Sequence, residues 1–458
     1  MISRIVAKDM ENASATRKMF EEGLKLRQKY GDDNVVDFSL GNPMLEPPED
    51  FNYFLKELAE SKKTGIHRYM PNAGNKDIRN AVAYHLNKKK YFDGVAGEEV
   101  CMTVGAAGAL NVLFKTILNK GEEVITILPY FPEYRFYIKN HNGKQVFVDS
   151  AEDFSLDIKA IEKKITNKTR AILLNSPNNP SGVMYSKQNL EELALMLSDK
   201  EKKLGRDIYL ISDEPYREMV YSGEFTSPAT LHDNSFIAYS WSKSLSLPGE
   251  RIGYATVNPK MKHKDDIIKG LAFCNRILGF VNAPTTMQYI LPKILNTEVE
   301  EKYFKYMRDY YKSLHDPLEK TLKENGYTFP SPQGSFFFWA KCPTEGKDLA
   351  KEEKEFIEDV KTNFLMLLVP GTTFGKTGWF RLSYAVNPKI IDMGCKKLEE
   401  VADKYIKKGC NCEHKCESCC EKHEEKQEYP EAYKDHDNIS PEHYTDEGMP
   451  PGQKSHGH

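Results

Sequence analysis

Short apolar runs that end in polar residues recur through the middle of the chain. The runs at 124–130, 171–176, 208–214 and 235–242 each have the length and composition of a buried β-strand. Between two of them, residues 187–204 show the apolar spacing of an amphipathic helix. A helix that connects buried strands is typical of a parallel sheet, so we predict an α/β fold with helices on both faces of a mostly parallel sheet.

The pattern changes near residue 300, where long charged helices replace the alternation. We predict a helix over 301–325, strands at 335–341, 364–371 and 379–386, and a final helix over 388–408. These elements indicate a smaller α+β domain over 299–408, beside a large domain over 46–298. The helix-rich segment 1–45 is expected to join the smaller domain.

Residues 409–458 differ from the rest of the chain in composition. They are rich in cysteine and then in Pro, Glu and His, with too few large apolar side chains for a core. We predict a disordered tail without a catalytic part. The alternative is a zinc or copper(I) site, because Cys416 and Cys419 have the C-x-x-C separation that lets two sulfurs reach one ion. No metal is expected at the active site.

Composition narrows the class of partner. The 458 residues carry 64 Lys+Arg against 67 Asp+Glu, so there is no basic excess for binding a nucleic acid. No apolar run reaches the length of a membrane span, and the first residues lack the apolar core of a signal peptide. We therefore expect a cytoplasmic protein that acts on small molecules and binds neither nucleic acid nor membrane.

The stretch SWSKSLSLPGERIGYA (240–255) places Lys243 among serines at the end of a predicted strand. Burial disfavours the charged form of an amine and lowers its pKa, and a neutral amine can form a Schiff base with an aldehyde. Ser240, Ser242 and Arg251 add hydroxyl and guanidinium donors that suit a phosphate dianion. Taken alone, this set of residues also fits an ordinary surface loop.

Two other strand ends supply complementary groups. Asn179 lies in the turn NSPNNPSG (175–182), and SDEPY (212–216) contains Asp213 and Tyr216. A pyridine ring that serves as an electron sink needs an acid at its nitrogen and donors at its phenolic oxygen. Ligands of such sheets bind at the carboxyl ends of the strands, so we expect these side chains to lie together there.

Six motifs, taken together, resemble the class I/II aminotransferases, the aspartate-aminotransferase-like enzymes of PLP fold type I. They are TVGAAGAL (103–110), PYFPEY (129–134), NSPNNPSG, SDEPY, SWSKSLSLPGERIGY and GWFRLS (378–383). The resemblance implies a large domain with a mostly parallel sheet, a smaller α+β domain and pyridoxal 5'-phosphate (PLP) as cofactor. It also implies ping-pong transfer of an amino group between an L-amino acid and a 2-oxo acid.

The resemblance implies a role for each matching residue. Lys243 matches the Schiff-base lysine and proton shuttle, and Asp213 matches the partner of the pyridine nitrogen. Tyr216 and Asn179 match the partners of the ring oxygen. The remaining cofactor contacts are implied for Phe131 on the pyridine face and, at the phosphate, for Ser240, Ser242, Arg251 and the backbone of Ala106 and Ala107.

Substrate binding is implied for Arg381, Gly41 and Asn179, with the arginine holding the α-carboxylate. Tyr69 resembles the tyrosine that reaches the cofactor phosphate of the other subunit, which implies a homodimer. Arg276 is either a second cation for a dicarboxylic substrate or part of a surface or interface salt bridge. The aromatic residues Phe131, Tyr134 and Phe280 leave an aromatic or aliphatic substrate open.

Two other functions remain as alternatives. A cystathionine-type C–S lyase would use the same fold and cofactor for β-elimination. A regulator that only senses PLP would carry an added DNA-binding domain, and neither a spare N-terminal domain nor a basic patch is present in the sequence.

Overall fold

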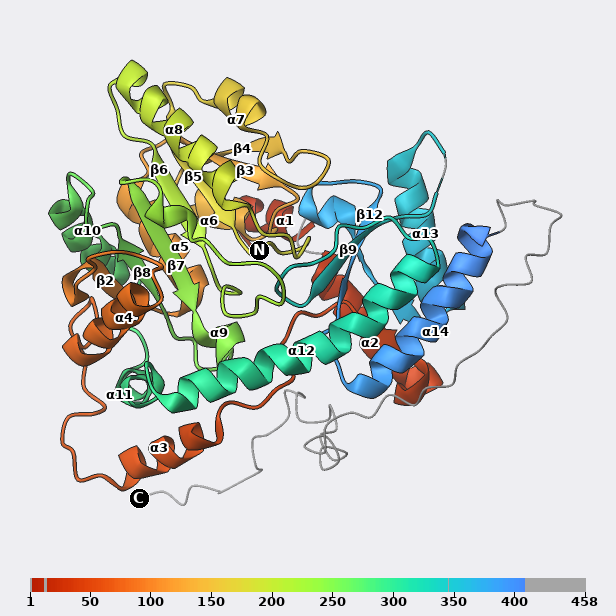
Figure 1. The fold of residues 1–458 in the computed structure, drawn as a ribbon, viewed down its shortest axis with the longest axis horizontal. Coiled ribbons are helices and arrows are strands. Elements are labelled where there is room, and N and C mark those ends of the chain that lie inside the picture. The colour runs from red at the N-terminus through yellow and green to blue at the C-terminus, as the bar shows by residue number, and fades with distance from the viewer. Residues whose placement is uncertain (1, 12–14, 345, 408–458) are drawn as a thin grey trace, which may run out of the picture. The chain divides into compact units, whose positions relative to one another are not determined.

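The computed structural model describes residues 2–11, 15–344 and 346–407, which are built around a seven-stranded sheet (Figure 1). Its strands follow the order β2-β8-β7-β6-β5-β3-β4. β8 runs antiparallel to β2 and β7, and the other neighbours are parallel. The predicted α/β class is confirmed. The bounds are Val100–Thr103 (β2), Glu123–Leu128 (β3), Lys144–Asp149 (β4), Thr169–Asn175 (β5), Tyr209–Asp213 (β6), Ser235–Ser240 (β7) and Gly253–Val257 (β8).

Helices cover both faces of this sheet because its strands are apolar on both sides. In β5, Ala171 and Leu173 belong to the core that includes α5, whereas Ile172 and Leu174 belong to the core that includes α8. Successive side chains of a strand point to opposite faces, so a continuous apolar run feeds two cores. The helices of this part are α3 (Glu49–Glu60), α4 (Lys76–Lys88), α5 (Gly105–Ile117), α6 (Tyr134–Asn140), α7 (Ile158–Lys164), α8 (Lys187–Leu204), α9 (Trp241–Ser244), α10 (Lys264–Ile277) and α11 (Thr285–Ile294).

The helix predicted over 187–204 is α8, and local signals at both ends explain the match. The Ser186 side chain accepts a hydrogen bond of 3.2 Å from the backbone N–H of Asn189, which caps the first turn. Gly205 follows the last turn with a φ of 63°, a left-handed conformation that glycine adopts without steric cost.

A second, antiparallel sheet has the order β11-β12-β9, with bounds Val369–Pro370 (β11), Trp379–Ser383 (β12) and Phe337–Lys341 (β9). Near the N-terminus, β1 (Val36–Asp37) pairs in parallel with β10 (Met366–Leu367). The single strand predicted over 364–371 is wrong, because β10 pairs with β1 whereas β11 pairs with β12. A continuous apolar run does not reveal that its two halves have different partners.

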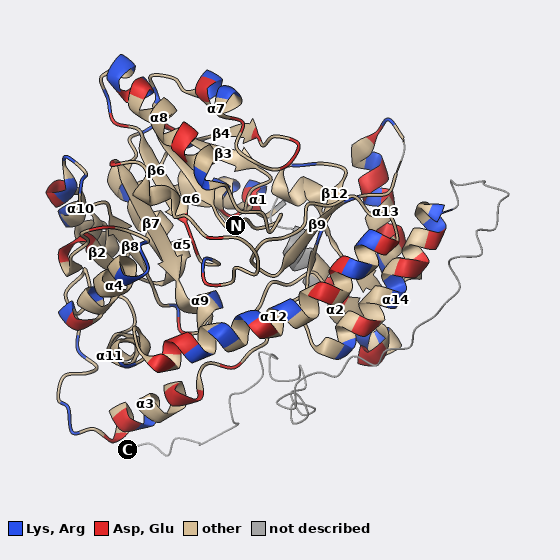
Figure 2. Ribbon diagram, viewed as in Figure 1, with Lys and Arg blue, Asp and Glu red and all other residues tan. Residues whose placement is uncertain are grey.

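The long helix α12 (Glu298–Glu324) runs from α11 toward β9 and α14 (Figure 1). Its buried side includes Phe304, Met307 and Leu314, while charged residues cover much of the rest of its surface (Figure 2). The remaining helices are α1 (Arg4–Glu11), α2 (Ala15–Tyr30), α13 (Leu349–Asn363) and α14 (Pro388–Tyr405).

Several sequence predictions are left open by the fold. The described chain forms one compact unit, so the boundaries after residues 45 and 298 stay predictions. Cys416 and Cys419, with the rest of 409–458, lie outside the described residues. Within the described ranges, no helix has the length and apolarity to cross a membrane. The same residues contain no group of three or more His, Cys, Asp or Glu side chains arranged to hold a metal ion.

Candidate active site

The predicted site residues on the large sheet meet at the carboxyl ends of adjacent parallel strands. Asp213 is the last residue of β6, and its neighbour across the sheet is Asn175 at the end of β5. Ser240 ends β7, and Lys243 follows it on the short helix α9. Because β5, β6 and β7 are parallel neighbours, their polar ends lie at one edge of the sheet.

Lys243 directs its amine to the backbone of the N-terminal segment. Its Nζ donates a hydrogen bond of 2.7 Å to the carbonyl oxygen of Gly41. Burial, together with the positive charges of Arg381 and Arg251, lowers the pKa of Lys243 to about 8. A Cβ at position 41 would lie 2.7 Å from the ring of Phe337, so only glycine fits here without displacing that ring. The amine therefore has a substantial neutral fraction near pH 8.

Asp213 is a buried carboxylate with one satisfied oxygen and one open oxygen. Its Oδ2 accepts a hydrogen bond from the hydroxyl of Tyr134, and its Oδ1 has no hydrogen-bond partner. Burial raises the pKa of Asp213 to about 7. A buried acceptor without a partner costs free energy, so Oδ1 is suited to a cationic N–H donor from a ligand. From the sequence, Tyr134 is expected only as an aromatic neighbour of the substrate.

Asn179 and Tyr216 lie side by side and are held by a residue that the sequence analysis missed. The Asn179 side chain hydrogen-bonds to Tyr216, and burial raises the pKa of Tyr216. Asn175 orders both loops: its Oδ1 accepts from the backbone N–H of Asn179 at 2.7 Å, and its Nδ2 donates to the carbonyl oxygen of Asp213 at 3.0 Å. Asn175 is the first residue of NSPNNPSG and the last residue of β5, and this position at a strand end is the sequence feature that could have identified it.

Arg381 brings a buried cation from β12 of the second sheet. Its Nη1 donates to Asn179 Oδ1 at 3.0 Å and its Nη2 to the carbonyl oxygen of Ser39 at 2.8 Å. The guanidinium carbon lies 4.5 Å and 4.9 Å from the ring centres of Phe337 and Phe374. Burial lowers the pKa of Arg381 to about 10, so it stays charged at neutral pH. Both acceptors are neutral, and the positive charge is therefore left for a carboxylate ligand.

The predicted phosphate ligands surround the first turn of α5. Ser240 Oγ and Ser242 Oγ are 2.6 Å apart, and a Cβ added to Gly105 would lie 3.3 Å from Arg251 Nη2 and 3.6 Å from Ser240 Oγ. Gly105 has a φ of +75°, which favours glycine. Ala106 and Ala107 follow in the first turn, where backbone N–H groups lack helical partners and attract anions. Hydroxyls, a guanidinium and free amides thus face one small space.

The structure brings Phe131 to the site but leaves Tyr69 and Arg276 at the surface. The Phe131 ring packs edge-to-face on Tyr134 at 5.4 Å, next to Asp213. Tyr69 is 86% exposed, and the guanidinium of the exposed Arg276 lies 5.4 Å from the ring of its own helix neighbour Phe273. One chain by itself therefore does not place Tyr69 or Arg276 in the site.

The donor set fits PLP. The open Oδ1 of Asp213 suits a protonated pyridine nitrogen, and the cradle around Gly105 suits a phosphate. The amine of Lys243 suits an aldehyde, while Arg381 is left for the carboxylate of a second ligand.

Comparisons with known proteins agree with this geometry. Residues 33–398 match the model of the family "Aminotransferase class I and II". The aspartate/prephenate aminotransferase of Thermus thermophilus is 30% identical over 378 residues, which cover 82% of this chain and 92% of that protein. The aromatic-amino-acid aminotransferase 2 of Thermococcus litoralis is 28% identical over 407 residues, 87% of this chain and 96% of that protein.

A solved structure supports the same assignment. The crystal structure of an aminotransferase from Eubacterium rectale superposes with a TM-score of 0.81 at 34% identity, covering 89% of this chain and all of that one. The family match, the relatives and the arrangement of the site agree with one another. The chain therefore belongs to the class I and II aminotransferases, a family whose members use pyridoxal phosphate.

Proposed function

We propose that Lys243, Asp213 and Tyr216 carry the transfer of an amino group between an L-amino acid and a 2-oxo acid by a ping-pong route. The observation that supports this most directly is the combination of Lys243, with its lowered pKa, and the open Oδ1 of Asp213 in one site. The cofactor, when bound, supplies the electron sink, and the protein supplies orientation, charge and a proton carrier.

Lys243 has two tasks in this proposal. Its amine would hold the cofactor through the aldehyde carbon. Once the amino group of the substrate has taken its place at that carbon, the released amine of Lys243 can take and return the proton at the α-carbon of the substrate. Both tasks need the neutral form, which the lowered pKa of Lys243 makes available. In the absence of ligands, the hydrogen bond to the carbonyl oxygen of Gly41 fixes the orientation of the Lys243 amine.

The other residues hold ligands in place. Asp213 would stabilise the positive charge of the pyridine nitrogen, while Tyr216 and Asn179 would hydrogen-bond to the ring oxygen. Phe131, which packs on Tyr134, would contact the face of the ring. Ser240, Ser242, Arg251 and the amides of Ala106 and Ala107 would hold the phosphate.

Arg381 positions the substrate. It binds the α-carboxylate with both arms of its guanidinium, and Asn179 and the backbone near Gly41 complete this pocket. The acceptors at Asn179 and Ser39 fix the plane of the guanidinium before the substrate arrives.

We further propose a homodimer. Phe273 and Ile277 lie one turn apart on α10 and are 52% and 47% exposed, and Tyr69 is 86% exposed; we infer that a partner subunit covers these side chains. In a homodimer Tyr69 would complete the phosphate site of the partner, and Arg276 would be available to a dicarboxylic substrate. Sedimentation of the purified protein tests this, since a monomer with full PLP affinity would contradict it. The cytoplasmic location expected from the sequence stays a prediction.

A spectroscopic screen of the twenty amino acids tests the function. An amino-acid substrate should convert the visible absorbance of the lysine-bound cofactor to that of the amine form, and adding a 2-oxo acid should restore it. Lys243→Ala is the negative control. If aspartate and glutamate are both inert, the acidic role of Arg276 is wrong. Release of pyruvate and sulfide from cysteine-derived substrates, without formation of the amine form, would instead indicate a C–S lyase.

A further inference from the structure

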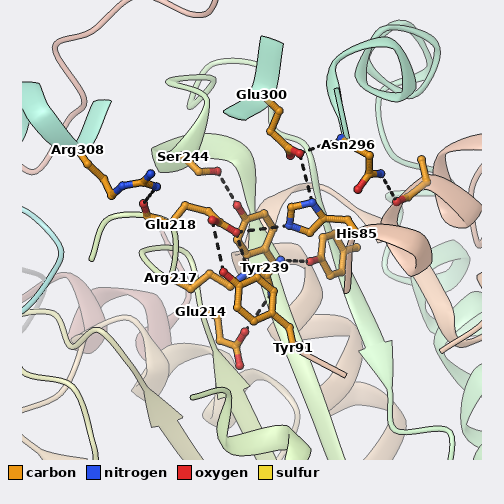
Figure 3. A network of polar contacts seen from close by, with 12 residues as sticks. His85, Tyr91, Glu214, Arg217, Glu218, Tyr239, Ser244, Asn296, Glu300 and Arg308 are labelled. Carbon is orange, nitrogen blue, oxygen red and sulfur yellow. Dashed lines mark hydrogen bonds and ion pairs between the residues drawn. The ribbon is translucent and has the colours of Figure 1, made fainter. Parts of the chain in front are cut away.

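A buried ionic cluster involves the loop that follows β6 (Figure 3). We call it the His85 cluster, and it contains two cations and three carboxylates on α4, the 214–218 loop and α12. The members are at most 5% exposed: His85, Glu214, Arg217, Glu218 and Glu300. Charged groups rarely lie so deep unless they are paired, and this cluster has no part in the proposed chemistry.

His85 lies between two carboxylates. Its Nε2 is 3.5 Å from Glu218 Oε1, and its Nδ1 is 3.4 Å from Glu300 Oε2. A neutral imidazole has a proton on only one nitrogen, so carboxylates on both sides favour the imidazolium. The contact from Nδ1 to Glu300 is an ion pair without hydrogen-bond geometry. Burial by itself would lower the pKa of His85, but Glu218 and Glu300 outweigh this effect and raise it. The other nearby ring is Tyr91, whose hydroxyl donates to Glu218 Oε2 at 3.4 Å.

Other charges reach the cluster from neighbouring positions. Lys89, just after α4, helps to lower the pKa of Glu218. Lys88 pairs with Glu301 at 3.1 Å and also interacts with the charge of Glu300. The backbone N–H of Asn296 donates to Glu300 Oε2 at 2.8 Å. His85 is nevertheless the cation that touches both Glu218 and Glu300.

Arg217 forms the other half of the cluster. Its guanidinium lies 4.4 Å and 4.0 Å from the ring centres of Tyr91 and Tyr239. Its Nη1 donates to Glu214 Oε2 at 3.0 Å and its Nε to Glu218 Oε1 at 3.4 Å. Glu218 therefore contacts both cations. The cluster already holds one carboxylate more than it has cations, so the loss of either cation would increase the excess of buried negative charge.

The cluster and the cofactor site share one short loop. Asp213 and Tyr216 face the cofactor site, whereas Glu214, Arg217 and Glu218 belong to the cluster. Anchoring one side of so short a segment also fixes the other side.

Two further contacts connect the cluster to its surroundings. Tyr239, which packs on Arg217, hydrogen-bonds to Ser244 at 2.6 Å, directly after Lys243. From α12, Arg308 donates to the carbonyl oxygen of Glu218 at 3.4 Å.

We propose that His85 is a positioning residue for the cofactor site. Its imidazolium joins Glu218 to Glu300, and through Glu218 it fixes the loop that presents Asp213 and Tyr216. The inference rests on the proposed function for the roles of Asp213 and Tyr216. The pKa of His85 is raised by folding, so its contribution is complete below the ordinary pKa of about 6.5 and is lost as pH rises through the raised value.

The experiment measures PLP binding by full-length His85→Gln, a neutral side chain of similar size. PLP is titrated into the apoenzyme, and the dissociation constant is compared with the wild-type value from about pH 6 to about pH 9. We expect a roughly tenfold weaker affinity at about pH 6, and a difference from the wild type that narrows as pH rises through the raised pKa of His85. The pH midpoint of the bound cofactor's visible absorbance should also shift.

Two further variants test the charge argument. His85→Gln with Glu300→Gln removes one cation and one carboxylate together, which restores the net charge of the cluster but not the link from Glu218 to α12. Affinity should therefore recover only in part, and full recovery would show that charge balance and not positioning is the cause. If the single His85 variant does not fold, Glu300→Gln alone can test the role of the His85 charge. The loss of one carboxylate lowers the pKa of His85, so the pH at which affinity declines should move down. His141→Gln is the matched control, because His141 is also buried but bonds to Asn111 outside the cluster.

The outcomes separate a positioning role from a merely structural one. If His85→Gln lowers only the thermal midpoint and leaves PLP affinity and the absorbance midpoint unchanged, the proposal is wrong. An equal loss of affinity at every pH would also overturn it, because the imidazolium would then not be the cause. Since PLP binding is measured without turnover, failure of the amino-acid screen would count against the proposed function and not against this inference.

Discussion

Replacing Tyr134 with phenylalanine tests the electrostatics at the centre of the site. Tyr134 is 2% exposed, and its hydroxyl donates to Asp213 Oδ2. Asp213 is 5% exposed, and its Oδ1 has no partner. The substitution removes one oxygen atom and leaves the ring that packs on Phe131. Its effect should therefore come from the lost hydrogen bond and not from a cavity.

The size of the effect follows from the charge of the acceptor. A hydrogen bond to a charged group contributes about 1.5–3 kcal/mol, which corresponds to about one to two pKa units. The pKa of Asp213 in the free protein is about 7, and the loss of Tyr134 should raise it to between about 8 and 9. At pH 7.5 the ionised fraction of Asp213 would fall from roughly three quarters to roughly one tenth.

PLP affinity reports this change directly. Because the protonated pyridine nitrogen needs the carboxylate form of Asp213, the affinity of Tyr134→Phe at pH 7.5 should fall by about one order of magnitude. The raised pKa means that the deficit is largest below about pH 7 and shrinks as pH rises through about 8–9. Titration of PLP into the apoenzyme across this range measures both the size and the pH dependence.

Tyr185→Phe is the matched control for this measurement. Tyr185 is buried, and burial alone raises its pKa, so removing its hydroxyl breaks no bond to the site. Its PLP affinity should equal that of the wild type. If Tyr134→Phe also binds PLP with wild-type affinity and an unchanged pH profile, the proposed electrostatic role of Tyr134 is refuted.

Four other predictions follow from the same site and from the tail. Lys243→Ala should bind PLP only non-covalently, without the visible absorbance of the lysine-bound form, and turnover should fall by several orders of magnitude; retained absorbance and turnover would show that another lysine acts. In the wild type, the rate of PLP attachment to the apoenzyme should rise with pH, with a midpoint at about pH 8, because the neutral amine of Lys243 is the nucleophile. In Arg381→Gln the midpoint of this pH profile should move to higher pH, because a nearby positive charge that lowers the pKa of Lys243 is lost. Arg381→Lys should lower kcat/KM for amino acids by about 100-fold, since an ammonium cannot replace the two-armed guanidinium, and an unchanged KM in steady-state assays would argue against carboxylate binding there. Cutting the chain after Gly409 should leave turnover and PLP affinity within about twofold of the full-length values and remove any stoichiometric zinc. If truncation instead abolishes activity, and added metal restores activity only in the full-length protein, the tail takes part in the reaction.

The sequence by itself determined those strands and helices whose apolar pattern and capping residues lie within a few positions of one another. The strands at 171–176 and 208–214 and the helix at 187–204 were predictable, because an apolar run and its capping residues lie next to each other in the chain. The same holds for Lys243 and Asp213, which stand at strand ends inside motifs that resemble those of a known family.

Tertiary structure decided the partners that come from distant parts of the chain. The bond from Tyr134 to Asp213 joins residues 79 positions apart, and no local pattern marks either one as the other's partner. His85 shows the same limit, since its carboxylates lie on the loop after β6 and on α12. The pairing of charged side chains in a core depends on which helices and strands pack against one another. A single sequence shows which face of each element is apolar, but not which other element packs on that face.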